Sequence, residues 1–217
     1  GCHVTLVTNA TPMSRHLGSR LGETITVAAR ERGLNILLTD AARVIEQAGH
    51  AAVELSDGTL VKGDLLLTAV GDIPNTGWLV DSGIGTGGAL AVDTRCRLRP
   101  DIVAAGDVAA VPTPRGYARS PLWHSAIEQA RVAANALLNG DASSPLCAHP
   151  YFWTEQFDLT IRVAGRTPLV GEPEFLDGDQ LSGPALLRWR RDDNSATAVS
   201  VNYRIPIPRL RKLCDPA

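Results

Sequence analysis

The chain has 217 residues, 44% of them hydrophobic and 20% charged, with a formal net charge of -2 at pH 7. This is ordinary globular composition, sufficient for a buried core in one or two domains. The near-neutral charge provides no field that would favour nucleic acid. Apolar runs such as residues 65–67 are too short to cross a bilayer, and the first residues lack the basic segment of a signal peptide.

Four cysteines and five histidines are scattered along the chain, without zinc-ligand spacing or a CxxC motif. The cysteines are Cys2, Cys96, Cys147 and Cys214. We interpret them as reduced thiols of a cytoplasmic protein, and we expect no metal site.

The first predicted elements form a strand–helix–strand unit. Residues 3–7 have the pattern of a buried strand, and residues 12–18 that of a loop. Apolar residues at helical spacing over 21–29 predict a helix that ends at Gly33, and residues 35–38 predict a second strand. This unit is typical of a parallel α/β sheet.

A meander follows, with predicted strands at 42–46, 51–55 and 60–62. The apolar run 64–70 then stops at Gly71. A central parallel strand that delivers a loop to a ligand at the carboxyl edge of its sheet has this pattern.

The next segments predict a strand at 90–98, a short buried strand over 102–107, and a Pro/Gly loop over 111–119. A long helix follows, with an apolar face running from Ile127 to Leu138 and with Gly140 at its end.

Residues 141–150 have the composition of a linker. Beyond it, short strands are predicted at 159–164, 185–190 and 196–203, and a short basic helix near Pro208.

The strongest functional signal is the strand of residues 102–107, which ends in Gly106 and Asp107. Together with the preceding residues from Val92, it resembles the second FAD fingerprint of the pyridine-nucleotide-dependent flavoprotein reductases. The resemblance implies that Gly106 lets the backbone approach the ribityl–phosphate chain and that Asp107 accepts hydrogen bonds from ribityl hydroxyls. Taken alone, the pair is equally typical of an aspartate that caps a turn.

The helix that begins near Leu122 and Trp123 is similar to the family's flavin helix. The resemblance implies that Leu122, Trp123 and Ala126 lie near the flavin, where the helix N-terminus stabilises negative charge on the reduced ring. An ordinary packed helix is the alternative. Pro121 stands where many relatives have Glu, which would alter flavin contacts or potential.

Residues 64–75 look like the strand by which the family's chain leaves the NAD domain. The resemblance implies that Gly71 and Asp72 approach the dinucleotide, and that Pro74 and Asn75 lead back into the FAD domain. A plain strand and turn is the alternative.

The segment 150–156 closely resembles the opening of the C-terminal domain in bacterial ferredoxin, rubredoxin and oxygenase-coupled reductases. The resemblance implies that Phe152 and Trp153 form a flat apolar wall beside the isoalloxazine and exclude water from it. The alternative is a pair of core aromatics under a linker. The match continues through residues 161–165.

The dinucleotide preference stays open in the sequence. Family members that use NADH usually end the first strand with an acid, whereas this chain has Thr8 and then Asn9. Arg15 is either a ligand for an adenosine 2′-phosphate or a surface residue.

The resemblance covers nearly the whole chain and implies an α/β fold of partial Rossmann-like segments followed by a small α+β domain. Residues 1–74 would be the C-terminal part of the NAD(P)-binding domain, residues 75–146 the returning FAD-domain segment, and residues 147–217 the C-terminal reductase domain. It implies FAD and NAD(P)H as cofactors and a ferredoxin- or rubredoxin-like iron–sulfur acceptor. No catalytic side chain is expected, because the flavin carries the chemistry.

Two alternatives remain: a flavin-dependent disulfide reductase or peroxidase, and a non-enzymatic redox-responsive binding protein on the same fold. The two GxGxxG phosphate loops of the family would lie upstream of Gly1, and the glycine-rich segment 83–88 precedes no predicted long helix, so we interpret it as a surface turn. The chain by itself is therefore expected to be inactive. Seven basic and three acidic residues between Leu186 and Ala217 predict a docking face for an acidic partner.

Overall fold

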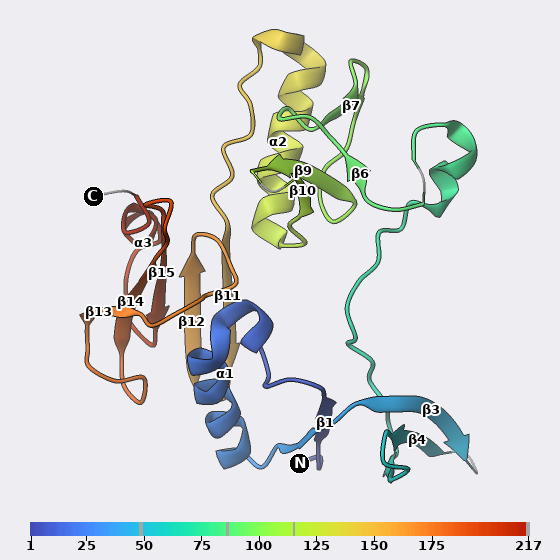
Figure 1. Ribbon diagram of the computed structural model, residues 1–217, viewed down its shortest axis with the longest axis vertical. Helices are drawn as coiled ribbons and strands as arrows, with labels where there is room; N and C mark the ends of the chain where they lie inside the picture. The colour runs from blue at the N-terminus through green and yellow to red at the C-terminus, as the bar shows by residue number, and fades with distance from the viewer. Residues whose placement is uncertain (48–49, 86, 115, 216–217) are drawn as a thin grey trace. The chain divides into compact units, whose positions relative to one another are not determined.

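The contacts of the chain divide it into two compact units, which we call the two-part unit and the central unit. The two-part unit comprises Gly1–Val70 and Trp153–Ala217, and the central unit is Gly71–Phe152 (green to gold in Figure 1). The computed structural model describes residues 1–47, 50–85, 87–114 and 116–215. The mixed α/β fold is confirmed, whereas the assignment of residues 1–74, 75–146 and 147–217 to three domains stays a prediction.

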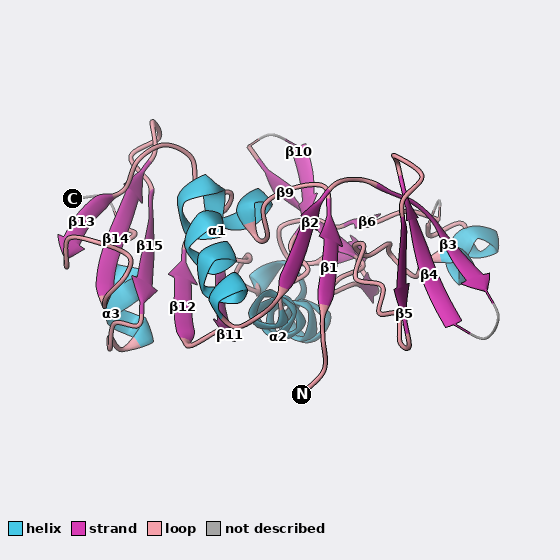
Figure 2. Cartoon of the chain, turned by 90° about the horizontal axis from the view of Figure 1, so that it is seen from below, coloured by secondary structure: helices cyan, strands magenta, loops and turns pink. Residues whose placement is uncertain are grey.

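The two-part unit begins with the predicted strand–helix–strand. Strands β1 (Thr5–Thr8) and β2 (Asn35–Leu38) pair in parallel, and α1 (Ser14–Glu31) connects them (Figure 2). The inner face of α1 is formed by side chains that are at most 1% exposed: Leu17, Leu21, Ile25 and Ala29. The helix begins within the segment predicted to be a loop, and Gly18 interrupts it with φ of 72°.

The predicted meander is an antiparallel sheet of β3 (Ala41–Gln47), β4 (His50–Leu55) and β5 (Leu60–Gly63). The predicted strand at 64–70 is wrong, because these residues form no strand. Leu65, Leu67 and Val70 are 78%, 83% and 95% exposed. An apolar run becomes a central strand only where neighbouring strands satisfy its backbone, and the described residues place none beside it.

The second part of the two-part unit is built on a five-stranded sheet with the order β11–β12–β15–β14–β13. Its strands are β11 (Tyr151–Gln156), β12 (Leu159–Ala164), β13 (Glu174–Asp177), β14 (Ala185–Arg190) and β15 (Ala196–Val201), followed by helix α3 (Ile207–Lys212). Fully buried aliphatic side chains from its middle strands, including Ile161, Leu187 and Val199, make the core. The three predicted strands and the basic helix are confirmed, although β15 ends at Val201 rather than at residue 203, and the two edge strands β11 and β13 are additional.

Residues far apart in the sequence pack together within the two-part unit. The backbone N–H of Leu169 donates to the carbonyl of His16 at 3.1 Å. A Cβ on Gly18 would stand 2.8 Å from the carbonyl oxygen of Leu169, so this close approach requires glycine. Arg20 pairs with Glu172 at 2.6 Å, which adds a surface ion pair to the same contact.

The central unit consists of short strands and one long helix. Its strands are β6 (Leu90–Ala91), β7 (Arg97–Arg99), β8 (Ile102–Val103), β9 (Ala109–Thr113) and β10 (Gly116–Arg119); its helices are η1 (Gly77–Ser82), α2 (Trp123–Asn139) and η2 (Gly140–Ala142). Strands β10, β9 and β6 form one sheet, in which β6 runs parallel to β9. Val92, Cys96, Ala109 and Ala133 form the buried core of this unit.

Four sequence predictions for the central unit are wrong. Of the short strand predicted over 102–107, only Ile102–Val103 (β8) forms a strand. The loop predicted at 111–119 belongs to a hairpin of β9 and β10, and the strand predicted at 90–98 is broken by a turn in which Cys96 N–H donates to Asp93 O at 3.0 Å. The inner face of α2 also differs from the prediction. It consists of Ser125, Gln129, Ala133 and Ala136, whereas Leu138 is 83% exposed.

None of the helices in the described ranges has both the length and the apolar character that crossing a membrane requires.

Gly165 joins β12 to the loop that follows, with φ of 104°, and a Cβ there would stand 2.8 Å from the carbonyl oxygen of Ala196. We expect Gly165→Ala to lower the free energy of unfolding by about 1–3 kcal/mol, because backbone strain and a backbone clash combine. Gly183→Ala is the control, since nothing lies within 4 Å of its Cβ position. Equal denaturation midpoints for the two variants would contradict this prediction, because they would show that the backbone around residue 165 accommodates a Cβ with no loss of stability.

Candidate functional site

The predicted Gly106–Asp107 motif forms a tight turn that leads into β9. The N–H of Ala109 donates to the carbonyl of Gly106 at 3.0 Å, and Gly106 has φ of 83°. This left-handed conformation favours glycine. A Cβ on Gly106 would meet the Cβ of Ala126 at 3.7 Å, an ordinary contact, so the backbone angle is what requires glycine here.

Two side chains hold this turn. The N–H of Gly106 donates to Oε1 of Gln129 at 2.7 Å, and Gln129 is only 2% exposed. Nε of Arg119 donates to the backbone carbonyl of Asp107 at 2.6 Å. The side chain of Asp107 is exposed, and its carboxylate accepts no hydrogen bond from a residue that the structure describes. The turn therefore presents a carboxylate with open acceptor sites from a fixed backbone.

Helix α2 begins beside this turn. Its N-cap residue, Leu122, is extended and makes no side-chain capping bond, and Ala126 N–H donates to Leu122 O at 3.0 Å. Ala126 contributes the Cβ that faces Gly106. Trp123 is 69% exposed. The structure thus places the predicted residues Gly106 and Ala126 next to each other.

The Gly71–Asp72 loop is tied to the same place. Gly71 has φ of 115°, and nothing lies within 4 Å of its Cβ position. The carboxylate of Asp72 forms an ion pair with Nη2 of Arg119, the residue that also holds Asp107. The loop does not follow a strand, contrary to the expectation, but Arg119 connects it to the Gly106–Asp107 turn.

The predicted aromatic wall lies on β11. Phe152 is half-buried and Trp153 is 46% exposed. Next to them, Tyr151 packs edge-on against the ring of His124, with centroids 6.0 Å apart. Phe152 ends the central unit and Trp153 begins the second part of the two-part unit, so the placement of both at one flavin face stays a prediction.

Thr8 ends β1, as the sequence predicts for a dinucleotide-binding position. Its hydroxyl donates to the carbonyl of Ala10 at 3.0 Å, and its own carbonyl accepts from Thr39 N–H at 2.9 Å. The next residue, Asn9, accepts a hydrogen bond from Nη2 of Arg15 at 2.8 Å. This bond holds a guanidinium beside the strand end without an acid at position 8 or 9.

Two residues of the site were missed in the sequence. Gln129 had a detectable signal, because it falls on the stripe of Ser125, Ala133 and Ala136 that α2 buries, and a polar residue there needs a partner. Arg119 had no such signal. Its role depends on the hairpin of β9 and β10, which the sequence did not predict.

The cysteines do not form a redox pair. All four are free thiols. Burial raises the pKa of Cys96 to about 11, and burial also raises the pKa of Cys214. A thiol with a raised pKa is a poor nucleophile at neutral pH, so neither residue suits thiol–disulfide exchange. Among the described residues, no group of three or more His, Cys, Asp or Glu is arranged to hold a metal ion.

A parallel strand–helix–strand unit, a glycine turn with an outward carboxylate and a helix start without a side-chain cap are features of dinucleotide-binding folds. The family model described as pyridine nucleotide-disulphide oxidoreductase matches residues 1–134. The chain belongs to this family.

Three similar proteins illustrate which members of this family the chain resembles. The chain is 29% identical, over 98% of its length and 54% of the relative, to a 3-phenylpropionate/cinnamic acid dioxygenase ferredoxin–NAD(+) reductase component of Photorhabdus laumondii. It is 31% identical to human apoptosis-inducing factor 3, over 89% of the chain and 33% of that protein. A solved ferredoxin reductase from Rhodopseudomonas palustris has a TM-score of 0.81 and 26% identity, over 94% of this chain and 51% of that one. The chain thus spans about half the length of the ferredoxin reductases it matches.

Asp107 is expected to be necessary for flavin binding in the full-length protein. Replacing it with Ala removes a charged acceptor, and each hydrogen bond to such a group contributes about 1.5–3 kcal/mol. Asp107→Ala should therefore weaken FAD binding about 10- to 100-fold, measured by titrating the apoprotein with FAD. Asp101→Ala, at an exposed aspartate of the same unit, is the control. Equal FAD affinity in both variants would remove Asp107 from the site.

Proposed function

We propose that the full-length protein is a reductase that passes electrons from NAD(P)H through FAD to a ferredoxin- or rubredoxin-like iron–sulfur protein. The observation that carries this proposal is the Gly106–Asp107 turn, held by Gln129 and Arg119 against the start of α2. FAD, when bound, would accept hydride and release single electrons.

The residues fit such a cofactor. Gly106 has the left-handed backbone that the turn needs, the carboxylate of Asp107 can accept hydrogen bonds from ribityl hydroxyls, and the start of α2 lacks a side-chain cap. The helix start would stabilise negative charge on the reduced ring. The names of the relatives from Photorhabdus and Rhodopseudomonas support an iron–sulfur acceptor.

Of NADH and NADPH, NADPH fits the residues at the end of β1 better. An acid at this position would accept hydrogen bonds from the ribose hydroxyls of NADH and repel a 2′-phosphate. Thr8 and Asn9 carry no charge, and Asn9 holds the guanidinium of Arg15 at 2.8 Å. A planar guanidinium is well suited to a phosphate.

Arg15→Ala in the full-length protein should lower kcat/KM for NADPH about tenfold or more and leave kcat/KM for NADH nearly unchanged, because only the 2′-phosphate contact is lost. The measurement is steady-state reduction of ferricyanide with each nucleotide. Arg30→Ala, an exposed arginine on the same helix, is the control. A wild type that prefers NADH would contradict the assignment.

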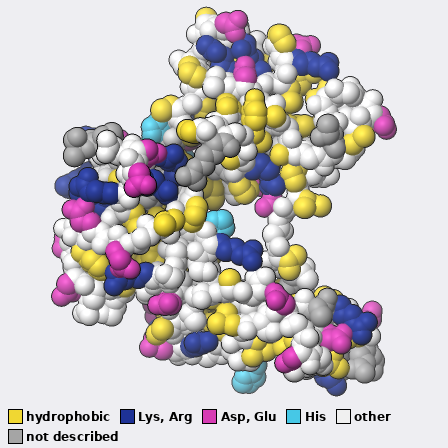
Figure 3. All heavy atoms as spheres, viewed as in Figure 1, with side chains coloured by type: hydrophobic (Ala, Val, Ile, Leu, Met, Phe, Trp, Pro, Cys, Tyr) yellow, Lys and Arg dark blue, Asp and Glu magenta, His cyan; other side chains and the backbone are white. Residues whose placement is uncertain are grey.

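The surface around α3 is the proposed docking face for the acidic iron–sulfur partner. Lys and Arg side chains (dark blue) gather there in Figure 3. Arg188 and Arg190 are already paired with Glu174, whereas Arg204, Arg209 and Lys212 are exposed. The cations at the C-terminal end of the chain, rather than those on β14, are thus available to a partner.

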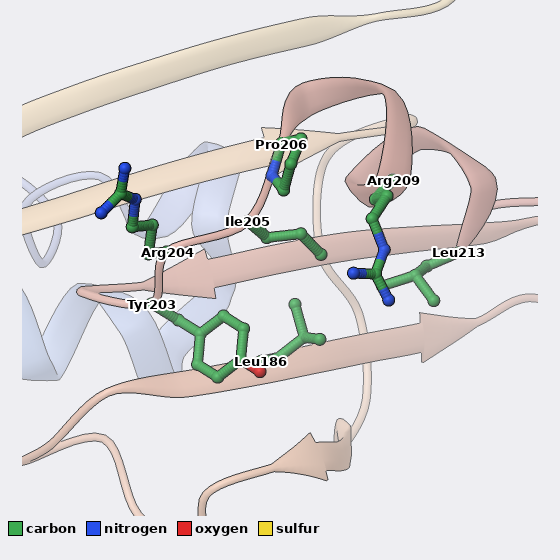
Figure 4. Close-up of a pocket in the computed structure, with 7 residues that line it drawn as sticks. All are labelled: Leu186, Tyr203, Arg204, Ile205, Pro206, Arg209 and Leu213. Carbon is green, nitrogen blue, oxygen red and sulfur yellow. The ribbon is translucent and has the colours of Figure 1, made fainter.

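A small pocket of about 150 Å³ lies at this face. Leu186, Tyr203, Arg204, Ile205, Pro206, Arg209 and Leu213 line it. Figure 4 shows Arg209 reaching from α3 towards Leu186 and Leu213, whereas Arg204 points away from them. The hydroxyl of Tyr203 donates to Asp177 at 2.6 Å, and this bond raises the pKa of Tyr203. The aliphatic residues of this pocket could pack against the methylene groups of a partner's Asp or Glu side chain, and the guanidinium of Arg209 could pair with its carboxylate.

Changing Arg209, Arg211 and Lys212 together to Glu should slow reduction of an acidic ferredoxin about tenfold at low salt, because steering of the encounter is lost. Reduction of ferricyanide, a small acceptor, is the internal control and should change little. The difference should shrink as ionic strength rises. An unchanged rate of ferredoxin reduction at low salt would place the docking face elsewhere.

A non-enzymatic, redox-responsive role is the second candidate, and the similarity to apoptosis-inducing factor 3 favours it. Steady-state turnover with an iron–sulfur acceptor distinguishes the two, since a binding protein would hold its reduced form without rapid electron release.

The free cysteines support a reducing compartment, and we propose the cytoplasm.

A further inference from the structure

Arg119 joins three separate segments of the central unit at the last position of β10. Its Nε donates to the carbonyl of Asp107 at 2.6 Å, and its Nη2 pairs with the carboxylate of Asp72. The Arg119 side chain is 19% exposed and that of Asp72 is 54% exposed. One half-buried guanidinium therefore holds the Gly106–Asp107 turn and the Gly71–Asp72 loop together.

This contact fixes the direction of Asp107. The two peptide groups that flank Asp107 are both hydrogen-bonded, because the Gly106 carbonyl accepts from Ala109 N–H and the Asp107 carbonyl accepts from Arg119. The Nε and Nη2 donors belong to one rigid planar fork. If the Gly71–Asp72 loop moves, the fork turns with it, and the peptide group after Asp107 must follow or lose its hydrogen bond.

We propose that Arg119 is a positioning residue that couples the Gly71–Asp72 loop to Asp107, so that occupancy at one changes affinity at the other. The inference rests on the proposed function, since it takes the loop as a dinucleotide contact and Asp107 as an FAD contact. Arg119 touches neither cofactor in this scheme and acts through the backbone of Asp107. The coupling is reciprocal, as linkage requires.

Two variants of the full-length protein test the coupling. Arg119→Lys keeps the charge, but a single ammonium cannot reproduce the fork. Asp72→Asn keeps the shape of the side chain and removes its charge, and the exposure of Asp72 makes a folding defect from this change small. The control is Arg99→Lys, at an arginine that also ends a short strand of this unit and donates to a backbone carbonyl, that of Gly83, at 3.2 Å.

The measured quantity is the FAD dissociation constant of the apoprotein, by flavin fluorescence, with and without saturating NADP⁺. In the wild type and in Arg99→Lys we expect the two constants to differ about fivefold or more. In Arg119→Lys and Asp72→Asn the ratio should fall towards one. Arg119→Lys should also weaken FAD binding about tenfold without NADP⁺, because the hydrogen bond to Asp107 is lost.

The flavin midpoint potential provides a second readout, because NADP⁺ should shift it in the wild type and not in the two test variants. A wild-type ratio near one, or an unchanged ratio in both test variants, overturns the coupling while leaving the proposed function intact. A full-length wild type that takes up no FAD overturns the proposed function, and the coupling with it.

Discussion

The central unit depends on the hydrogen bond from the N–H of Gly106 to the buried amide of Gln129. Gly106 is partly buried and Gln129 is only 2% exposed, so breaking this bond would leave the buried amide of Gln129 without its partner, at a cost of about 1–3 kcal/mol. The bond therefore favours the face of α2 that meets the turn. Gln129 lies one helical turn beyond Ser125, and the same face brings Ala126 against Gly106. The position of the helix start, where the sequence predicts flavin contacts, is therefore a consequence of one polar contact deeper in the helix.

The turn is held on its other side by charge. Arg119 pairs with the carboxylate of Asp72 through Nη2 and donates from Nε to the carbonyl of Asp107. The carboxylate of Asp107 is left as an exposed acceptor, because the bonds that hold this residue use its backbone. A functional carboxylate can be held firmly in this way without consuming its lone pairs, which a direct salt bridge would do.

The sequence predicted those elements that are determined by their own residue pattern. Apolar alternation located β12 and β14 to the residue, and the position of Gly140 marked the end of α2. The prediction of a loop over 111–119 was wrong because Pro112, which is usually excluded from the interior of a sheet, lies within strand β9. Pro112 pairs with Tyr117 of β10, but the ladder between β9 and β6 reaches only Ala109 and Ala110, so no neighbour needs the missing N–H of Pro112.

The Gly106–Asp107 turn could be located from a single segment of the sequence, although its role as a cofactor contact stays a prediction. The position of Arg119 could not, because it depends on separate segments that meet only in the fold. The remaining discrepancies concern apolar residues that the sequence assigned to a core. Leu65, Leu67 and Leu138 are 78%, 83% and 83% exposed. Leu65 and Leu67 lie in one exposed segment, whereas Leu138 belongs to the central unit. Exposed apolar side chains that cluster in this way usually mark a surface that meets another partner. Since the chain spans about half of its reductase relatives, we expect the full-length protein to bury these residues, so that the apolar pattern in the sequence is a property of the longer fold.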